Sequence, residues 1–397
     1  MIQNKILQLS EKIFPEIDQH RRHLHQNPEL SFQEYKTAEY IEQQLRQWNI
    51  SYKKVANTGI IATLGKSTKT NRCIALRADI DALPIQEKNN CSYASSVPNV
   101  MHACGHDVHT ACALGVIRVL KEIEHNLNGC VKIFFQPGEE VLPGGATLMI
   151  KEKALSNPKV NSVIAQHVFP DLEAGKVGFR SGPYMASTDE IYITIIGKGG
   201  HGAMPERANN PIPVASHLIT EISKEFPLER MIKEHTILSF GKFIANGATN
   251  VIPEKVELAG TMRTLNPKKR EQLYKFLKQI TTNFSKKYKV KVQLNIVKGY
   301  PPLINNPSLT EFFKIKAIEL LGKKNVVELP IRMTADDFAY YLQKVPGTYY
   351  RLGTGNKKKG ITHNVHTPYF DIDENALFYG TSTMSWLIFN YLNNFNN

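Results

Sequence analysis

The sequence has few cysteines and no long hydrophobic run, and these deficits exclude several classes of protein. Five cysteines in 397 residues, scattered without a spacing pattern, do not form a disulfide framework and favour a reducing compartment. No apolar stretch approaches the roughly 18 residues that a membrane-spanning helix needs. Ile2, Ile6, Leu9 and Ile13 recur at helical spacing with charges between them, unlike a secretory signal. We therefore expect a cytoplasmic protein without a membrane partner.

Acidic residues are also in deficit, because 36 Asp and Glu stand against 49 Lys and Arg and give a formal net charge of +13. Such an excess can attract nucleic acid. The lysine clusters at 268–270, 286–287 and 357–359 lie in no recognisable reading helix or aromatic platform. We therefore expect a solvated basic surface, with a mild preference for anionic small molecules and no nucleic-acid partner.

The length of the chain and the order of its expected elements predict two domains, because 397 residues exceed the usual size of one core. The first part alternates helices and strands, with strands expected at 59–64, 73–77, 131–135 and 162–165 and helices at 107–124 and 146–153. Strands and helices then follow in the β-α-β-β-α-β order of a ferredoxin-like unit: 191–196, 211–226, 236–240, 256–263, 268–286 and 290–297. We expect an α/β fold in which residues 1–186 and 301–397 form a domain with a mixed central sheet. Residues 187–300 form an inserted ferredoxin-like α+β domain.

The nine residues from Met101 to His109 contain three histidines, a cysteine and an aspartate. Ligands at this density suggest a transition-metal site. Three further ligand-rich segments follow, at 136–140, 166–167 and 363–366. Several of these residues come directly after expected strands, where open α/β sheets bind ligands. We therefore expect one site that the fold assembles from distant segments.

Seven segments resemble, in the same order, motifs of the binuclear metallo-amidohydrolases, a family that includes hippurate hydrolases, bacterial N-acyl-amino-acid deacylases and plant auxin-conjugate hydrolases. The segments are HQNPEL (25–30), RADIDALP (77–84), HACGHDVH (102–109), FQPGEE (135–140), QHVFPDL (166–172), GKGGHGAMP (197–205) and HTPYFDIDE (366–374). The resemblance implies a metal-binding catalytic α/β domain with an inserted lid and dimerisation domain. It also implies a homodimeric enzyme that hydrolyses the amide bond of N-acyl amino acids with two divalent metal ions per subunit. Zinc or manganese suits the mixed ligands, and cobalt or nickel is an alternative.

The resemblance assigns five metal ligands in this sequence: Cys104, His106, Glu140, His167 and His366. It gives the Cys104 thiolate the place between the two ions, and His363 remains a competitor of His366. Two adjacent carboxylates on a turn cannot easily point at the same atom. By resemblance Glu140 is the ligand and Glu139 is the general base that accepts a proton from the attacking water.

Several polar residues near these ligands have less certain roles. Asp79 is expected not to bind metal, whereas Asp81 is expected to orient a ligand histidine, since metal-bound imidazoles usually require an outer acceptor. His102, Asp107 and His109 either support the ligands in the same way or satisfy only the backbone of their loop.

The segment at 197–205 superficially suggests a phosphate loop, but it lacks the GK[ST] ending of such loops. The resemblance instead makes His201 a catalytic lid residue that binds substrate, often in the partner subunit's site, and stabilises the developing oxyanion. It places Asn250 and Arg263 near the substrate carboxylate, a group that the arginine fork suits. For Arg263 a structural ion pair is the alternative.

Two positions depart from the family pattern. Gly138 stands where the family commonly has alanine, and Asp336 replaces a glutamate near the expected acyl pocket. The second change leaves the substrate preference open. A carboxypeptidase or dipeptidase of the same architecture is one alternative function, and a catalytically inactive metal-binding protein is another. The retained Glu139 and His201 argue against the inactive protein.

Overall fold

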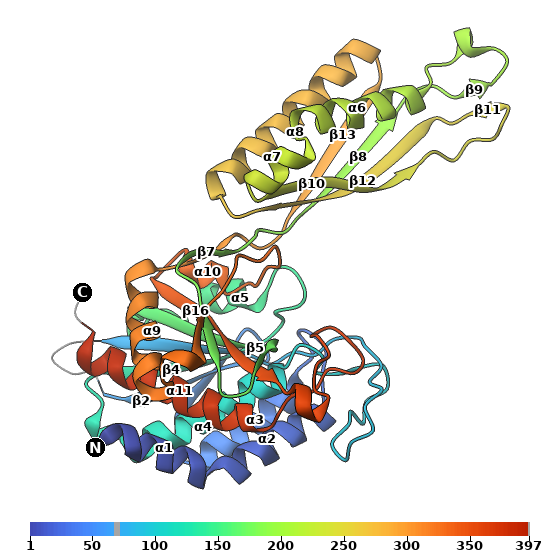
Figure 1. Ribbon diagram of the computed structural model, residues 1–397. Coiled ribbons are helices and arrows are strands. Elements are labelled where there is room, and N and C mark those ends of the chain that lie inside the picture. Colours follow the sequence, from blue (N-terminus) through green and yellow to red (C-terminus); the bar gives the residue numbers. More distant parts are fainter. Residues whose placement is uncertain (67–71, 396–397) are drawn as a thin grey trace. The chain divides into compact units, whose positions relative to one another are not determined.

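The computed structural model describes residues 1–66 and 72–395 (Figure 1). Within them the chain forms two compact units. The first unit comprises Met1–Gly182, Asn305–Pro330 and Asp337–Asn397, and the second comprises Pro183–Ile304 and Ile331–Asp336. The expected domain boundaries, at 186/187 and 300/301, stay predictions, because a compact unit is not by itself an independent domain.

The first unit contains an eight-stranded sheet in the order β1-β2-β4-β3-β5-β16-β6-β15. The bounds are β1 Ser51–Val55, β2 Gly59–Gly65, β3 Cys73–Asp79, β4 Cys130–Gln136, β5 Ser162–Glu173, β6 Val177–Phe179, β15 Val326–Glu328 and β16 Gly347–Gly355. Strands β4, β3, β5 and β16 are parallel to one another, whereas β2 runs antiparallel to both of its neighbours, β1 and β4. The sheet is therefore mixed, as predicted. Because four neighbouring strands are parallel, their carboxyl ends meet at one edge of the sheet.

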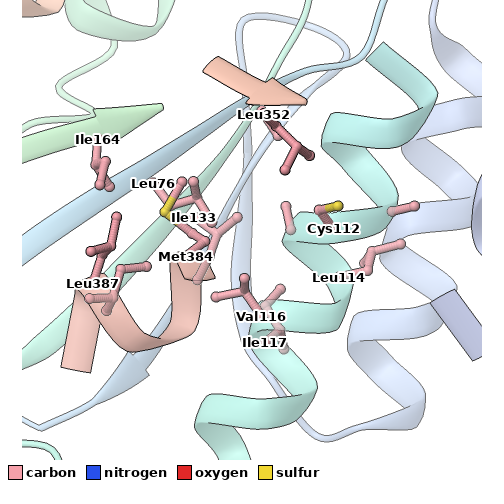
Figure 2. Close-up of a cluster of buried hydrophobic side chains, with 14 of the residues drawn as sticks. Leu76, Cys112, Leu114, Val116, Ile117, Ile133, Ile164, Leu352, Met384 and Leu387 are labelled. Carbon is pink, nitrogen blue, oxygen red and sulfur yellow. The ribbon is translucent and has the colours of Figure 1, made fainter. Parts of the chain in front are cut away.

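Helices cover this sheet. They are α1 Ile2–Lys12, α2 Phe14–Gln26, α3 Tyr35–Gln47, α4 His106–Glu122, α5 Gly145–Lys151, α9 Pro307–Leu321, α10 Ala339–Leu342 and α11 Asn375–Asn394. Helix α4 is buried along nearly its whole length, and from Ala111 to Leu120 every residue except Arg118 is apolar. Figure 2 shows its side chains in the hydrophobic core together with strand residues and with Met384 and Leu387 of α11. A Cβ on Gly115 would lie 2.8 Å from Ile17 of α2 and from Thr381 of α11, so glycine permits this close packing.

The start of α4 is set by a single residue. Gly105, the N-cap of the helix, has φ of 76°, a left-handed conformation that glycine adopts without steric cost. A Cβ at this position would also approach Val168 to 2.6 Å. The residues on either side of Gly105 are thereby held at the carboxyl edge of the sheet.

The second unit has the strand order β10-β12-β8-β13, with all neighbours antiparallel. Its elements are β8 Asp189–Ile196, α6 Pro211–Glu225, α7 Leu228–Lys233, β10 Thr236–Ile244, β12 Lys255–Thr264, α8 Pro267–Tyr288 and β13 Lys291–Lys298. This is the ferredoxin-like arrangement expected from the order of elements, with one hydrophobic core between the helices and the sheet. Strands β9 (Gly200–His201) and β11 (Val251–Ile252) form a small sheet at one end of this unit (Figure 1). Strands β7 (Gly182–Met185) and β14 (Leu303–Asn305) also pair.

Within the described part of the chain, no helix combines the length and the apolar character that crossing a bilayer requires.

Candidate metal centre

The five expected metal ligands come from four segments of the first unit. Cys104 and His106 lie where α4 begins, and Glu140 lies in the turn that follows β4. His167 lies inside β5, which continues to Glu173 and is longer than the predicted strand 162–165. His366 lies in the loop between β16 and α11, where its backbone amide donates to Ala103 O at 2.7 Å. That contact brings the two distant loops together.

The Cys104 thiol lies at the centre of the cluster. Its Sγ is 3.5 Å from His167 Nε2 and 3.3 Å from His366 Nε2. Glu140 Oε1 is 3.2 Å from the same His366 nitrogen. Among the described residues, five sets of potential ligand atoms lie within 4.8 Å of one another, and two of them contain Cys104: Cys104 with His106 and His167, and Cys104 with Glu140 and His366. The two sets share only the Cys104 sulfur.

The structure brings His366, and not His363, to this cluster. The His363 ring contacts Tyr369 instead, with ring centroids 5.3 Å apart, and His363 belongs to none of the candidate ligand groups among the described residues. His366 has φ of 63°, an unfavourable conformation for a residue with a side chain. Strain of this kind is concentrated at functional sites.

His106 Nε2 is buried and has no hydrogen-bond partner. Glu140 Oε1, 4.0 Å away, is also buried and makes no hydrogen bond, although it has the ion-pair contact with His366 Nε2. A buried polar atom left without a partner costs about 1–3 kcal/mol. A divalent cation would compensate both atoms, and thiolate, imidazole and carboxylate are the donors that zinc and similar ions bind. The residues present therefore fit a metal centre.

Asp81 orients His106, as expected. His106 Nδ1 lies 2.9 Å from Asp81 O and 3.2 Å from Asp81 Oδ1, so its other nitrogen is directed into the cluster. The second carboxylate oxygen of Asp81 accepts hydrogen bonds from the amide of Glu140 at 3.0 Å and from Ser31 Oγ at 2.7 Å. A carboxylate oxygen of Glu139 lies within 4.8 Å of ligand atoms of His106 and Glu140.

The remaining polar residues of the 102–109 segment bind different partners. Asp107 accepts from Arg21 at 2.9 Å and lies 2.8 Å from His25 Nδ1, and all three side chains are buried. His109 binds the carboxylate of Asp79. The ring of His102 is buried, and neither nitrogen has a hydrogen bond. Asp107 and His109 therefore bind side chains and do more than satisfy the backbone of their loop.

The expected lid residues lie in the second unit. His201 is exposed on β9, and its Nδ1 accepts from the amide of Ala203 at 3.1 Å. Asn250 is adjacent, because its carbonyl oxygen accepts from the amide of Gly202 at 2.8 Å. Arg263 lies near the opposite end of β12, where its Nη1 donates to Met262 O at 3.0 Å. Eight residues of strand at ~3.3 Å each separate Arg263 from Lys255, so one copy of this unit does not bring Arg263 together with His201 and Asn250.

Comparison with known proteins supplies the family. The profile of peptidase family M20/M25/M40 matches residues 75–390. The chain belongs to this family. An N-acetyl-L-cysteine deacetylase from Bacillus subtilis is 37% identical over 358 residues, which cover 90% of this chain and 83% of the relative. An N-acyl-L-amino acid amidohydrolase from Geobacillus stearothermophilus is 36% identical over 308 residues, which cover 77% and 82%.

A solved structure of the same family has the same fold. It is the Bacillus subtilis YxeP protein, described as a dinuclear metal-binding peptidase of family M20. It superimposes with a TM-score of 0.83 at 30% identity and covers 97% of this chain and 100% of its own. The mixed sheet with a second α+β unit is thus the architecture of an M20 peptidase.

One position, Gly138, shows how this M20 chain supports its candidate site. Gly138 has φ of 57°, and a Cβ there would lie 2.3 Å from Phe32 Cε1, so the local structure of this chain requires glycine where alanine is common. The amide of Gly138 also donates to Glu34 Oε1 at 2.8 Å. The turn that carries Glu139 and Glu140 is therefore anchored to the segment that follows α2.

A buried carboxylate missed by the sequence-based prediction connects three elements beside Glu139. Asp337 accepts hydrogen bonds from Arg77 Nη2 at 2.8 Å, Gln136 Nε2 at 2.8 Å and the amide of Ala146 at 2.9 Å. These donors belong to β3, β4 and the first turn of α5. The signal was present in the sequence, because Arg77 is a charged residue inside an apolar strand and requires a buried acid as partner.

The protonation of the cluster predicts how metal binding depends on pH. Burial, followed by the carboxylates of Glu140 and Glu139, raises the pKa of the Cys104 thiol well above its usual value. Burial lowers the pKa of His106, but Asp79 and Asp81 outweigh it and raise this pKa to about 10. Without metal, both groups therefore carry protons near neutral pH.

We expect metal binding to release protons and to weaken as the pH falls, because a ligand must lose its proton before it binds. Both pKa values are raised above neutrality, so the affinity should increase steadily between about pH 6 and pH 8. Isothermal titration of metal-free protein in buffers of different ionisation enthalpy measures the number of protons released. An affinity that is constant over this range would contradict the prediction.

Proposed function

We propose that the protein is a metal-dependent amidohydrolase that cleaves the amide bond of N-acyl amino acids and releases an amino acid and a carboxylic acid. The observation that carries this proposal is the pair of ligand sets that share the Cys104 sulfur. The names of the two relatives, a deacetylase and an amidohydrolase acting on N-acylated amino acids, support the substrate class.

The ligand geometry favours two ions per subunit. One ion would be held by Cys104, His106 and His167, and the other by Cys104, Glu140 and His366, with the thiolate common to both. The donor set suits zinc, with manganese as the main alternative and cobalt or nickel as further ones. When bound, divalent ions polarise the amide carbonyl and lower the pKa of the attacking water.

Glu139 is proposed as the general base. It lies beside Glu140 on the same anchored turn, and only 7% of its surface is exposed. Its carboxylate is close enough to the ligand atoms of His106 and Glu140 to meet a water molecule placed between them. Glu139 would accept the proton of that water and pass it to the leaving amine, which departs as a neutral amino group.

His201 and Asn250 are proposed to act together at the substrate, in the site of a partner subunit. Their proximity on the small sheet of the second unit and the exposure of His201 support a shared role. The His201 imidazole would donate to the oxygen that becomes negative during attack. Arg263 is proposed to bind the substrate carboxylate from a different position. This arrangement requires a homodimer in which the second unit serves as lid and dimerisation domain.

We further propose a cytoplasmic location. The five cysteines are all free, and four of them are buried. Thiols in this state are typical of a reducing compartment.

Removal of metal tests the proposed function. We expect protein treated with a strong chelator to lose hydrolysis of N-acetyl and N-benzoyl amino acids, and to recover it when zinc or manganese is restored. Product amino acid can be followed with a ninhydrin assay, with dipeptides and C-terminally amidated substrates run in parallel. If the metal-loaded protein cleaves dipeptides and no N-acyl amino acid, the proposed substrate class is wrong.

A further inference from the structure

A buried acid and a histidine stand beside the candidate ligands, and the proposed chemistry uses neither. Asp79 is the last residue of β3, and its side chain is fully buried. Arg77 Nη1 binds Asp79 Oδ2, and His109 Nδ1 lies 2.5 Å from Asp79 Oδ1. Both oxygens thus have protein partners. Although Asp79 Oδ2 lies 3.6 Å from His106 Nε2, this carboxylate is committed to Arg77 and His109.

The contacts of His109 determine which of its nitrogens carries the proton. The backbone amide of Val168 donates to His109 Nε2 at 2.9 Å. That nitrogen therefore carries no proton, and Nδ1 donates the ring proton to Asp79. Asp79, His109 and the Val168 amide form one directed chain of hydrogen bonds.

The peptide group of Val168 connects these hydrogen bonds to His167. Strand β5 pairs with β3 only as far as Ala165, so the amide of Val168 lies beyond the last pair of that ladder and takes a side-chain acceptor instead. The carbonyl oxygen of Val168 accepts from His167 Nδ1 at 2.8 Å. His167 Nε2 is thereby directed toward Cys104 Sγ, 3.5 Å away. The rings of His109 and His167 also touch, with centroids 4.6 Å apart.

We propose that Asp79 and His109 are positioning residues that hold the Val168 peptide and so aim His167 at its metal ion. The inference rests on the proposed function, because it takes His167 to be a ligand. Outer partners of metal-bound histidines commonly contribute 10–100-fold to metal affinity. The ion held by Cys104, His106 and His167 should depend on the pair, and the other ion should not.

Three substitutions of His109 distinguish the contribution of its hydrogen bond to Asp79 from that of its hydrogen bond with the Val168 amide. His109→Ala removes both hydrogen bonds. His109→Asn keeps a donor for Asp79 but does not reach Val168, whereas His109→Gln places a carbonyl oxygen within reach of Val168. In competition with a chromogenic chelator, we expect the alanine and asparagine variants to lose about 10–100-fold in affinity for one of the two ions. The glutamine variant should lose less, and the cobalt form should show a changed absorption spectrum for that ion alone.

Cys112→Ala provides the matched control, because Cys112 lies on the same helix, is fully buried and donates its thiol hydrogen to Leu377 O of α11. It should bind both ions as the wild type does. The positioning role would be overturned if all three His109 variants bound both ions with wild-type affinity. It would also be overturned if His109→Ala and Cys112→Ala lost equal amounts of metal affinity. A wild-type protein that binds no divalent ion would instead contradict the proposed function. If His109→Ala does not fold, the positioning role is tested by comparing the metal affinities of the other two variants. The glutamine variant should bind the affected ion more tightly than the asparagine variant.

Discussion

Replacing Glu139 by glutamine is expected to lower kcat by about 10²–10⁴-fold, because a positioned general base contributes a factor of this size. The amide keeps the shape of the side chain but cannot accept the proton of the attacking water. Glu139 is not among the proposed ligands, so the metal content should remain that of the wild type. Steady-state kinetics on the best N-acyl amino acid, with metal analysis of the same sample, measures both quantities.

Two further variants serve as comparisons for Glu139→Gln. Glu140→Gln alters a proposed ligand and should lose metal together with activity, whereas Glu152→Gln changes an exposed glutamate of the same unit and should change neither. A Glu139→Gln enzyme that retains full kcat with full metal would show that another group manages the proton.

Replacing Asp337 by asparagine is expected to destabilise the first unit by about 1.5–3 kcal/mol, because it removes one of the two carboxylates that bind the buried Arg77 and leaves Asp79 as the other. The asparagine amide would also face donors from Gln136 and Ala146 where the carboxylate accepted them. Both tryptophans of the chain, Trp48 and Trp386, belong to the first unit. Tryptophan fluorescence during urea unfolding therefore reports on this unit alone.

The exposed Asp171→Asn serves as the control for Asp337→Asn and should leave the urea midpoint unchanged. A loss in the Asp337 variant of less than about 1 kcal/mol, the scale of an ordinary hydrogen bond, would show that the charge of Asp337 matters little to Arg77.

Much of the fold could be predicted from local patterns. The period-two strands and the β-α-β-β-α-β order describe regularities within short segments, and the second unit shows that arrangement. The expected ends of β3 and β4 were also correct enough to place Asp81 and Glu140 at one edge of the sheet. The end of β5 was not, because the run of apolar residues stops at Ala165 while pairing with β16 continues past His167.

The candidate site was harder to predict where it depends on contacts between distant segments. His366 meets Cys104 across 262 positions, and only the resemblance of the segment HTPYFDIDE to a family motif favoured it over His363, three residues earlier. In the folded chain, the hydrogen bond from the His366 backbone amide to Ala103 O holds His366 beside Cys104. Asp337 and His109 were missed or left open for the same reason, since each acts through partners on other elements.

The central claim, that Cys104 joins two metal ions, is tested most directly by X-ray absorption spectroscopy of the zinc-loaded protein together with its metal content. We predict two zinc ions per subunit, a sulfur neighbour at ~2.3 Å from each, and a metal–metal scattering contribution. In Cys104→Ala the sulfur and metal–metal contributions should both disappear. One zinc per subunit, or two zinc ions without sulfur neighbours, would contradict the account.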